Sequence, residues 1–127
     1  MIAHAIRRAL AVAASLAAGA ALAAGAPLVI GRTADFSGPQ AAAVKETTAA
    51  AHAYFDRVNQ AGGVNGRPIV LESMDDGFDP KRTAGNARRL IAEKQPLALM
   101  LSRGTANAEA LIPVTQENRI AVVAPIR

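Results

Sequence analysis

Four short apolar runs recur along this chain, and three longer amphipathic stretches separate them. The runs have the length of buried strands: Leu28–Gly31, Ile69–Leu71, Leu97–Leu101 and Ile120–Val123. The longer stretches repeat apolar residues at helical spacing, and they predict helices over Ala41–Asn59, about Pro80–Lys94 and about Ala108–Glu117. The order β-α-β-α-β-α-β predicts an α/β fold with a doubly wound parallel sheet and right-handed crossovers. We expect the run Leu97–Leu101 to be buried on both faces.

Packing faces and helix ends can be predicted from the same pattern. The first helix should pack one apolar stripe onto the sheet, and the second should turn a similar set inward: Val44, Ala51, Tyr54, Phe55 and Val58 in the first, and Ala84, Ala87, Leu90 and Ile91 in the second. Gly62-Gly63 should end the first helix, because glycine accepts the positive φ of a helix C-terminus. Asn65-Gly66 predicts a turn. Asp79-Pro80 predicts a helix start, with a capping carboxylate before a first-turn proline.

The first residues have a different character and predict export. Arg7 and Arg8 precede an uncharged run rich in alanine and leucine, Ala9–Ala24, which is the pattern of a secretory signal peptide. Ala21-Leu22-Ala23 supplies small residues for cleavage before Ala24, so we expect a signal peptide over residues 1–23 and a mature domain over 24–127. The alternative is a membrane anchor, but the run is short for a span of about 20 residues.

Charge and cysteine content narrow the classes of function. The net charge is +4, and removing Arg7 and Arg8 lowers it by two. No basic patch with interleaved aromatic residues is present, so nucleic acid is not an expected partner. The absence of cysteine excludes disulfides, thiol catalysis and thiolate metal sites.

Candidate binding residues follow from the predicted sheet. Ligands of open α/β sheets bind beyond the carboxyl ends of the strands. Ser102–Asn107 joins a strand to a helix start, where backbone N–H groups and the Thr105 hydroxyl suit a carboxylate. The alternative is an ordinary capping loop, in which Thr105 or Asn107 only satisfies the helix. Ser37-Gly38-Pro39 opens the first helix in the same way, with a hydroxyl from Ser37 and close backbone approach at Gly38.

Other chemistries find little support. Neither of the glycine-rich nucleotide-binding spacings is present. Asp75-Asp76-Gly77-Phe78-Asp79 could suggest calcium, but the further ligands and closing glutamate of an EF-hand are missing, so a turn and a helix cap are the better interpretation. His52, the only histidine after cleavage, lies in mid-helix without a metal or catalytic motif. We expect no catalytic residues, no metal and no cofactor.

A set of short motifs, in order across nearly the whole mature chain, carries a family likeness. They are Ile30-Gly31, Ser37-Gly38-Pro39, Tyr54-Phe55-Asp56, Val58-Asn59, Gly62–Gly66, Asp75-Asp76, Asp79-Pro80, Asn86, Leu90-Ile91, Gly104-Thr105, Val123 and Pro125. With them the chain resembles the amino-terminal part of the leucine/isoleucine/valine-binding type of periplasmic solute-binding proteins of ABC transporters. The resemblance implies a two-lobed clamp that closes on a small solute in the periplasm and delivers it to a membrane permease.

The resemblance also implies roles for particular residues. In such proteins the first lobe holds the ligand carboxylate through hydroxyls and backbone N–H groups after the third and fourth strands. By position that role falls on Thr105, with Arg103 or Gly104, while Ser37, Gly38 and Gln40 line the cleft and Pro125–Arg127 begins the next contact loop. Arg103 departs from what a plain aliphatic amino acid requires, and could favour another carboxylate or an aromatic acid, or simply point to solvent.

Three functions remain in view from the sequence. The first is capture of an amino acid or related carboxylate for an ABC importer, with the membrane contacted only through the permease. The second is an enzyme on a similar sheet, which the fold alone would permit. The third is a truncated gene product or a ligand-sensing domain without transport, because members of the family are several hundred residues long and carry a second lobe.

Overall fold

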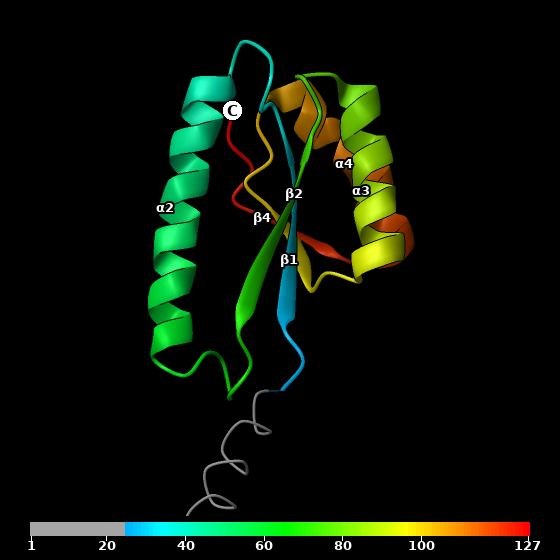
Figure 1. Ribbon diagram of the computed structural model, residues 1–127. Helices are drawn as coiled ribbons and strands as arrows, with labels where there is room; N and C mark the ends of the chain where they lie inside the picture. The colour runs from blue at the N-terminus through cyan, green and yellow to red at the C-terminus, as the bar shows by residue number, and fades with distance from the viewer. Residues whose placement is uncertain (1–24) are drawn as a thin grey trace, which may run out of the picture.

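The computed structural model describes residues 25–127, so the predicted signal peptide lies outside the described part of the chain. Within it, strands and helices alternate from end to end (Figure 1). The strands are β1 Leu28–Ala34, β2 Ile69–Asp75, β3 Ala98–Met100 and β4 Ala121–Val123; the helices are α2 Ala41–Gln60, α3 Pro80–Lys94 and α4 Thr105–Asn118. The predicted order of elements is confirmed.

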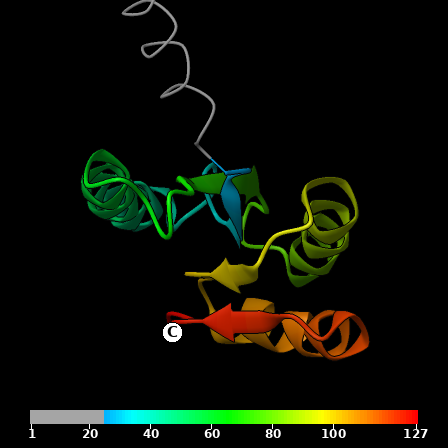
Figure 2. The same ribbon diagram turned by 90° about the horizontal axis from the view of Figure 1, so that it is seen from below.

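The sheet is doubly wound. Its strand order is β2-β1-β3-β4, and all neighbouring strands are parallel. Helix α2 covers one face, while α3 and α4 cover the other (Figures 1 and 2). The chain moves outward from β1 to β2 and then crosses back to β3 on the other side of β1. The boundary between β1 and β3 is therefore the switch point of the sheet, where ligands of this architecture bind.

The main core lies between the sheet and the α3–α4 pair. It consists of five buried apolar residues: Ala87, Leu90, Leu99, Leu111 and Val114. The expected inward face of α3 is confirmed, since Ala87 and Leu90 are fully buried and Ala84 and Ile91 pack against the cluster. Each fully buried leucine contributes about 1.5–3 kcal/mol relative to an exposed one.

Helix α2 buries a narrower stripe than its sequence predicts. Val44 is fully buried, but Tyr54 is 66% exposed and does not face the sheet. Its ring instead meets the edge of Phe55, with ring centroids 6.2 Å apart. The prediction for Tyr54 is therefore wrong, because helical spacing defines a broad sector and this helix covers only part of the sheet.

Strand β3 is shorter and less buried than expected. Leu97 lies outside it and is 65% exposed, although its N–H donates to the Val29 carbonyl at 2.8 Å. Only Leu99 of this strand is fully buried. The expectation that the whole run Leu97–Leu101 is buried is wrong, because its first residue precedes the region that the helices cover.

The predicted start of α3 and the predicted end of α2 are confirmed. Asp79 caps α3, accepting a hydrogen bond from the Lys81 N–H at 2.8 Å, and Pro80 is the first helical residue. Gly62 and Gly63 follow α2 with positive φ angles of 103° and 72°. Helix α4 begins at Thr105, three residues earlier than the expected start at Ala108.

Candidate functional site

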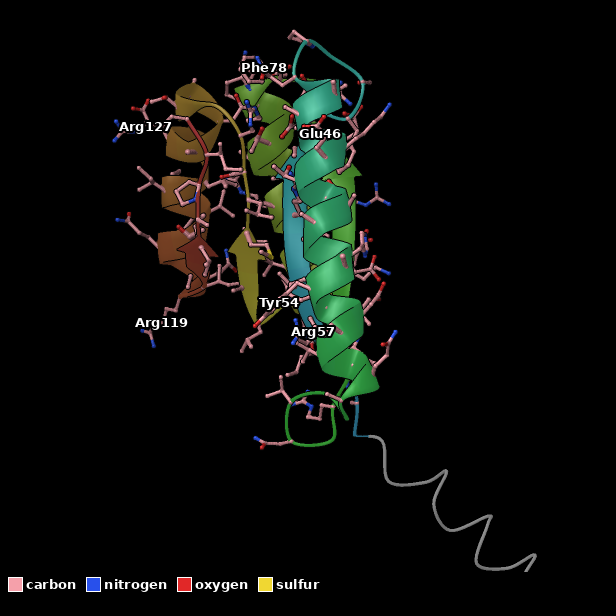
Figure 3. All side chains as sticks on the ribbon, turned by 90° about the vertical axis from the view of Figure 1, so that its left-hand side faces the viewer. Glu46, Tyr54, Arg57, Phe78, Arg119 and Arg127 are labelled. Atoms are coloured by element: carbon pink, nitrogen blue, oxygen red, sulfur yellow. The ribbon has the colours of Figure 1, made fainter. Side chains whose placement is uncertain are left out.

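Loops from distant parts of the chain meet at the switch point. Arg103, after β3, donates from Nε to the Oε1 of Gln40, after β1, at 3.0 Å. The segment after β4 joins them through its backbone: Gly104 donates to the Ile126 carbonyl at 2.9 Å, and Ile126 donates to that of Ser102 at 2.8 Å. Figure 3 shows Phe78 and Arg127 at the end of the molecule where these loops lie, with Arg119 toward the other end.

A small hollow of about 160 Å³ opens between these loops. Its lining consists of Gln40, Phe78, Arg103, Gly104 and Arg127. Four of the residues predicted from sequence, Gln40, Arg103, Gly104 and Arg127, are therefore brought together by the fold. Thr105 follows directly as the exposed first residue of α4.

Two helices begin at this hollow. Gln40 is the N-cap of α2 and Gly104 that of α4, and neither helix has a side-chain cap. The alternative of an ordinary capping loop fails for Asn107, whose buried side chain instead donates to Thr83 Oγ1 at 2.7 Å. Within residues 25–127, the first N–H groups of α4 at Thr105 and Ala106 have no hydrogen-bond acceptor from the protein. Such free N–H groups and the helix dipole attract an anion.

Gly104 is required by its conformation and by its neighbours. Its φ of +94° is one that side-chain-bearing residues rarely adopt. A Cβ there would lie 2.8 Å from the Phe78 ring and 3.2 Å from Asn107 Oδ1. The glycine thus lets the Phe78 ring pack against the start of α4 and form one wall of the hollow.

Asp35 holds the loop that carries Gln40. Its carboxylate is fully buried and accepts hydrogen bonds from the backbone N–H groups of Gly38 and, at 2.7 Å, Gln40. A Cβ on Gly38 would lie 2.6 Å from this carboxylate, so the close approach that glycine allows here is made by Asp35. Asp35 is a positioning residue that the sequence analysis did not single out.

Ser37 does not line the hollow, and neither does Gly38. The Ser37 hydroxyl is exposed and donates to Asp75 Oδ2 at 2.6 Å. This hydrogen bond is the main reason that the pKa of Asp75 is lowered to about 2, with further contributions from the N–H groups of Phe36 and Gly77 and from Arg82. A ligand role for Ser37 and Gly38 stays a prediction.

The acidic loop after β2 uses its carboxylates within the protein. Asp76 is buried and accepts from Thr33 Oγ1 at 3.0 Å, Thr83 Oγ1 at 2.9 Å and the Phe78 N–H at 3.0 Å. Asp79 caps α3. Across the described residues, no cluster of three or more histidine or acidic side chains is arranged to hold a metal ion.

Arg32 is a buried residue outside the lining of the hollow that the sequence analysis missed. It lies in β1 with no exposed surface, and it donates to the Leu101 carbonyl at 3.3 Å, to Thr47 Oγ1 at 2.9 Å and to Thr48 Oγ1. The predicted strand ends at Gly31, whereas β1 continues to Ala34 and includes Arg32. Ser102 was predicted only as the first residue of the candidate segment Ser102–Asn107; its buried hydroxyl has no hydrogen-bond partner within the described part of the chain.

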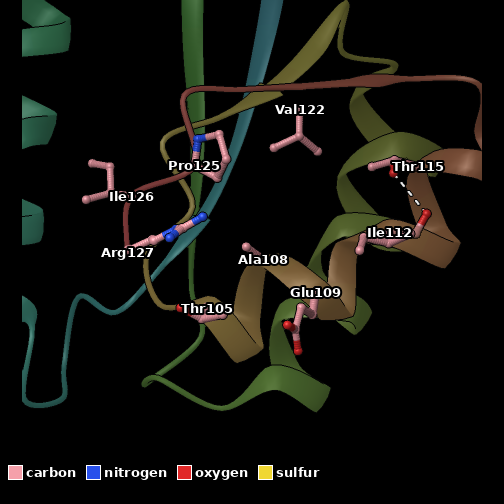
Figure 4. Close-up of a pocket in the computed structure, with 9 residues that line it drawn as sticks. All are labelled: Thr105, Ala108, Glu109, Ile112, Thr115, Val122, Pro125, Ile126 and Arg127. Atoms are coloured by element: carbon pink, nitrogen blue, oxygen red, sulfur yellow. Dashed lines mark hydrogen bonds between the residues drawn. The ribbon is translucent and has the colours of Figure 1, made fainter.

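A larger groove of about 430 Å³ runs along the outer side of α4 and β4 (Figure 4). Its walls are mainly apolar, formed by Ala108, Ile112, Val122, Pro125 and Ile126, with Thr105 and Arg127 also in its lining. It lies toward the edge strand of the sheet rather than at the switch point. The smaller hollow, with its guanidinium groups and helix starts, is the better candidate for binding a polar ligand.

Comparison with known proteins identifies the family. A family model described as "Periplasmic binding protein" matches residues 27–127. The chain belongs to the periplasmic binding protein family. This confirms the resemblance found in the sequence, and the switch-point hollow is thus part of a periplasmic binding protein lobe.

Individual relatives agree with this assignment. The Leu/Ile/Val-binding protein BraC3 of Rhizobium johnstonii is 30% identical over 99 residues, covering 76% of this chain and 26% of the relative. A substrate-binding periplasmic protein from Ralstonia solanacearum is 36% identical with a TM-score of 0.74, covering 77% of this chain and 28% of the other. LivJ of Streptococcus pneumoniae, solved with isoleucine, shares the fold at 19% identity and a TM-score of 0.73, over 79% and 29% of the two chains.

This periplasmic binding protein chain spans about a quarter of the length of the relatives it matches. Among the helices of residues 25–127, none is long and apolar enough to cross a membrane.

Proposed function

We propose that this protein captures a small carboxylate-bearing solute, an amino acid or related acid, and delivers it to the membrane permease of an ABC importer. One observation carries the proposal: the loops after β1, β3 and β4 meet at the switch point around a hollow that contains Arg103, Gln40 and the start of α4. The names of the relatives, which are binding proteins for leucine, isoleucine and valine, support a role in binding.

In this proposal, residues 24–127 form part of the first lobe of a two-lobed clamp, and a second lobe contacts the other end of the ligand. The ligand carboxylate lies against the N–H groups and hydroxyl at Thr105, with Arg103 and Gly104 beside it. Residues 1–23 direct export to the periplasm, and the permease is the one membrane partner. No step of this function needs catalysis, a metal or a cofactor.

Thermal shift and calorimetry on the full-length protein, meaning the product of the complete reading frame, test this function. Amino acids, their amides and small organic acids form the ligand panel. We expect saturable binding of at least one carboxylate, without chemical change of the ligand, and a weaker interaction after Thr105→Val. If no compound in the panel raises the melting temperature, or if a bound compound is converted to a product, the proposal fails.

Ligand sensing without transport is the second candidate. It uses the same hollow, so the distinction lies in the permease. Uptake of the identified ligand in cells that express or lack the protein separates the two. Uptake that depends on the protein supports transport, whereas binding without any effect on uptake supports sensing.

A further inference from the structure

The charge of the hollow indicates which carboxylates it accepts. We propose that the site selects ligands with net negative charge over zwitterionic amino acids such as leucine. These ligands are small organic acids that either lack an ammonium group or carry two or more carboxylates. Arg103 is the residue that sets this preference. The inference rests on the proposed function of ligand capture and specifies its ligand class.

Arg103 is held in place while most of its guanidinium stays available. Its Nε donates to Gln40 Oε1 at 3.0 Å, and its backbone is fixed by a parallel bridge to Ile126. Among the described residues, neither of its terminal nitrogens has a hydrogen-bond or ion-pair partner. A guanidinium held in this way presents a planar pair of N–H donors that matches a carboxylate.

The lining contains two guanidinium groups and no acidic side chain. Arg103 and Arg127 contribute the charge, while Gln40, Phe78 and Gly104 are neutral. The ion pairs within residues 25–127 join Arg82 to Asp75, Arg89 to Glu93 and Lys94 to Glu72, so none neutralises this hollow. A ligand ammonium group would enter a region of positive charge that offers it no carboxylate.

Three acidic side chains of the neighbouring loops are already engaged by the protein, while Glu109 lines the adjoining groove and lies outside the lining of the hollow. Asp35 accepts from the N–H groups of Gly38 and Gln40, and Asp76 from Thr33, Thr83 and Phe78. Asp75 accepts from Ser37 and from the Phe36 N–H. An ammonium group could compete for these carboxylates only by breaking hydrogen bonds that position the loops of the site.

A second guanidinium lies buried near Arg103 with only neutral partners. Arg32 donates to one carbonyl and to the hydroxyls of Thr47 and Thr48. Both hydroxyls donate their protons to carbonyls of α2, which leaves their lone pairs for Arg32. Burial and, next, the nearby charge of Arg103 lower the pKa of Arg32. An anion bound at Arg103 relieves this repulsion, whereas a zwitterion of zero net charge does so less.

The test compares ligands of different charge on the full-length protein. Isothermal titration with succinate, glutamate and benzoate measures anions, and titration with leucine and valine measures zwitterions of zero net charge. We expect at least one of the anions to bind roughly tenfold or more tightly than leucine or valine, because the ammonium group of a zwitterion is repelled by the two guanidinium groups of the lining.

Three substitutions in the hollow and one control outside it isolate the contribution of charge. Arg103→Gln should weaken the preferred anion roughly ten- to hundredfold, and Arg103→Lys should restore part of that loss. Gln40→Glu keeps an acceptor for Arg103 Nε but adds a negative charge to the lining, so it should weaken the anion roughly tenfold while affecting leucine less. Arg88→Gln, an exposed site on α3 outside the hollow, removes the same charge and should leave both affinities unchanged.

The outcomes separate this inference from the proposed function. Leucine or valine binding more tightly than every anion, with little effect of Arg103→Gln, would overturn the inference and leave ligand capture intact. If Gln40→Glu and the neutral variant Gln40→Ala lowered the affinity for the anion equally, Gln40 would only position Arg103 and the charge of the lining would not select the ligand. That result would also contradict the inference. Binding of neither class would overturn both.

Discussion

Asp76 joins three parts of the fold through one buried carboxylate. It accepts hydrogen bonds from Thr33 of β1, from the backbone of Phe78 in the loop and from Thr83 of α3. Thr83 Oγ1 in turn accepts from Asn107 of α4, so the network extends to the helix that begins at the candidate site. A buried network in which every member is satisfied rigidifies its surroundings, and a missing member is costly.

Asp76→Ala should therefore lower the free energy of unfolding by about 3 kcal/mol, because it leaves the buried Thr33 hydroxyl and the Phe78 N–H without their acceptor. Urea denaturation of the full-length protein measures this loss. Asp56→Ala, exposed on α2, is the matched control and should change stability by less than about 0.5 kcal/mol. If Asp76→Ala lowered the free energy of unfolding by less than a typical surface substitution does, the network would not stabilise the lobe.

Asp75 makes the stability of the folded lobe depend on pH in the acidic range. The hydrogen bond from Ser37 lowers its pKa to about 2 from 3.8, so its carboxylate stabilises the folded state above pH 3.8. As pH falls toward 2, the unfolded chain takes up the proton first, and the stabilisation is lost. We expect the urea midpoint of the wild type to fall more steeply between pH 4.5 and 2 than that of Asp75→Asn. Parallel pH profiles for the two proteins would contradict this.

At the scale of elements, two glycines on neighbouring helices should respond in opposite ways. Gly104 has a φ of +94° and no room for a Cβ, so Gly104→Ala should destabilise the protein by roughly 1–3 kcal/mol and displace Phe78 from the hollow. Gly85 lies within α3 with open space around its Cβ position, and Gly85→Ala should stabilise by about 0.5–1 kcal/mol.

Urea denaturation and ligand titration together check this pair. Gly104→Ala should also weaken ligand binding, whereas Gly85→Ala should leave it unchanged. Equal effects of the two substitutions on stability would show that the conformation at Gly104 is not a requirement of the fold.

The helix ends that could be predicted from the sequence are those that neighbouring residues determine. Asp79-Pro80 predicted the start of α3, and Gly62-Gly63 predicted the end of α2, because capping and positive φ depend on neighbouring residues. The exposure of Tyr54 and Leu97 depends on how far each helix extends over the sheet, and periodicity does not contain that information.

The candidate site was predictable in its location and less so in its members. The strand-end rule indicated the loops of Gln40 and Arg103, which the structure joins by a hydrogen bond. Arg32 was missed because a charged residue in a strand gains its meaning from partners 15 and 69 positions away. Phe78 was missed as a wall of the hollow because its place there depends on the close approach that Gly104 allows.

At the scale of the whole molecule, residues 25–127 leave much apolar surface uncovered around β4. Ile112 and Val123 are 51% and 50% exposed. A second apolar hollow of about 210 Å³, formed by residues that include Phe55, Met100 and Val123, opens on the α2 side of the sheet. Contiguous apolar surface of this kind on a soluble protein usually marks contact with further protein.

The polypeptide 24–127 alone should consequently be marginally folded and bind ligand poorly. Within the described part, seven apolar residues are fully buried, and the candidate hollow is open to water. A small core supplies little net stability, and water weakens every charged contact in an open site.

Circular dichroism should show a broad, early thermal transition, and calorimetry should give dissociation constants of about a millimolar or weaker. The full-length protein under the same conditions is the control, and it should melt sharply and bind at least a hundredfold more tightly. A cooperative melt and micromolar affinity in the polypeptide 24–127 would show instead that these residues fold and hold their ligand by themselves.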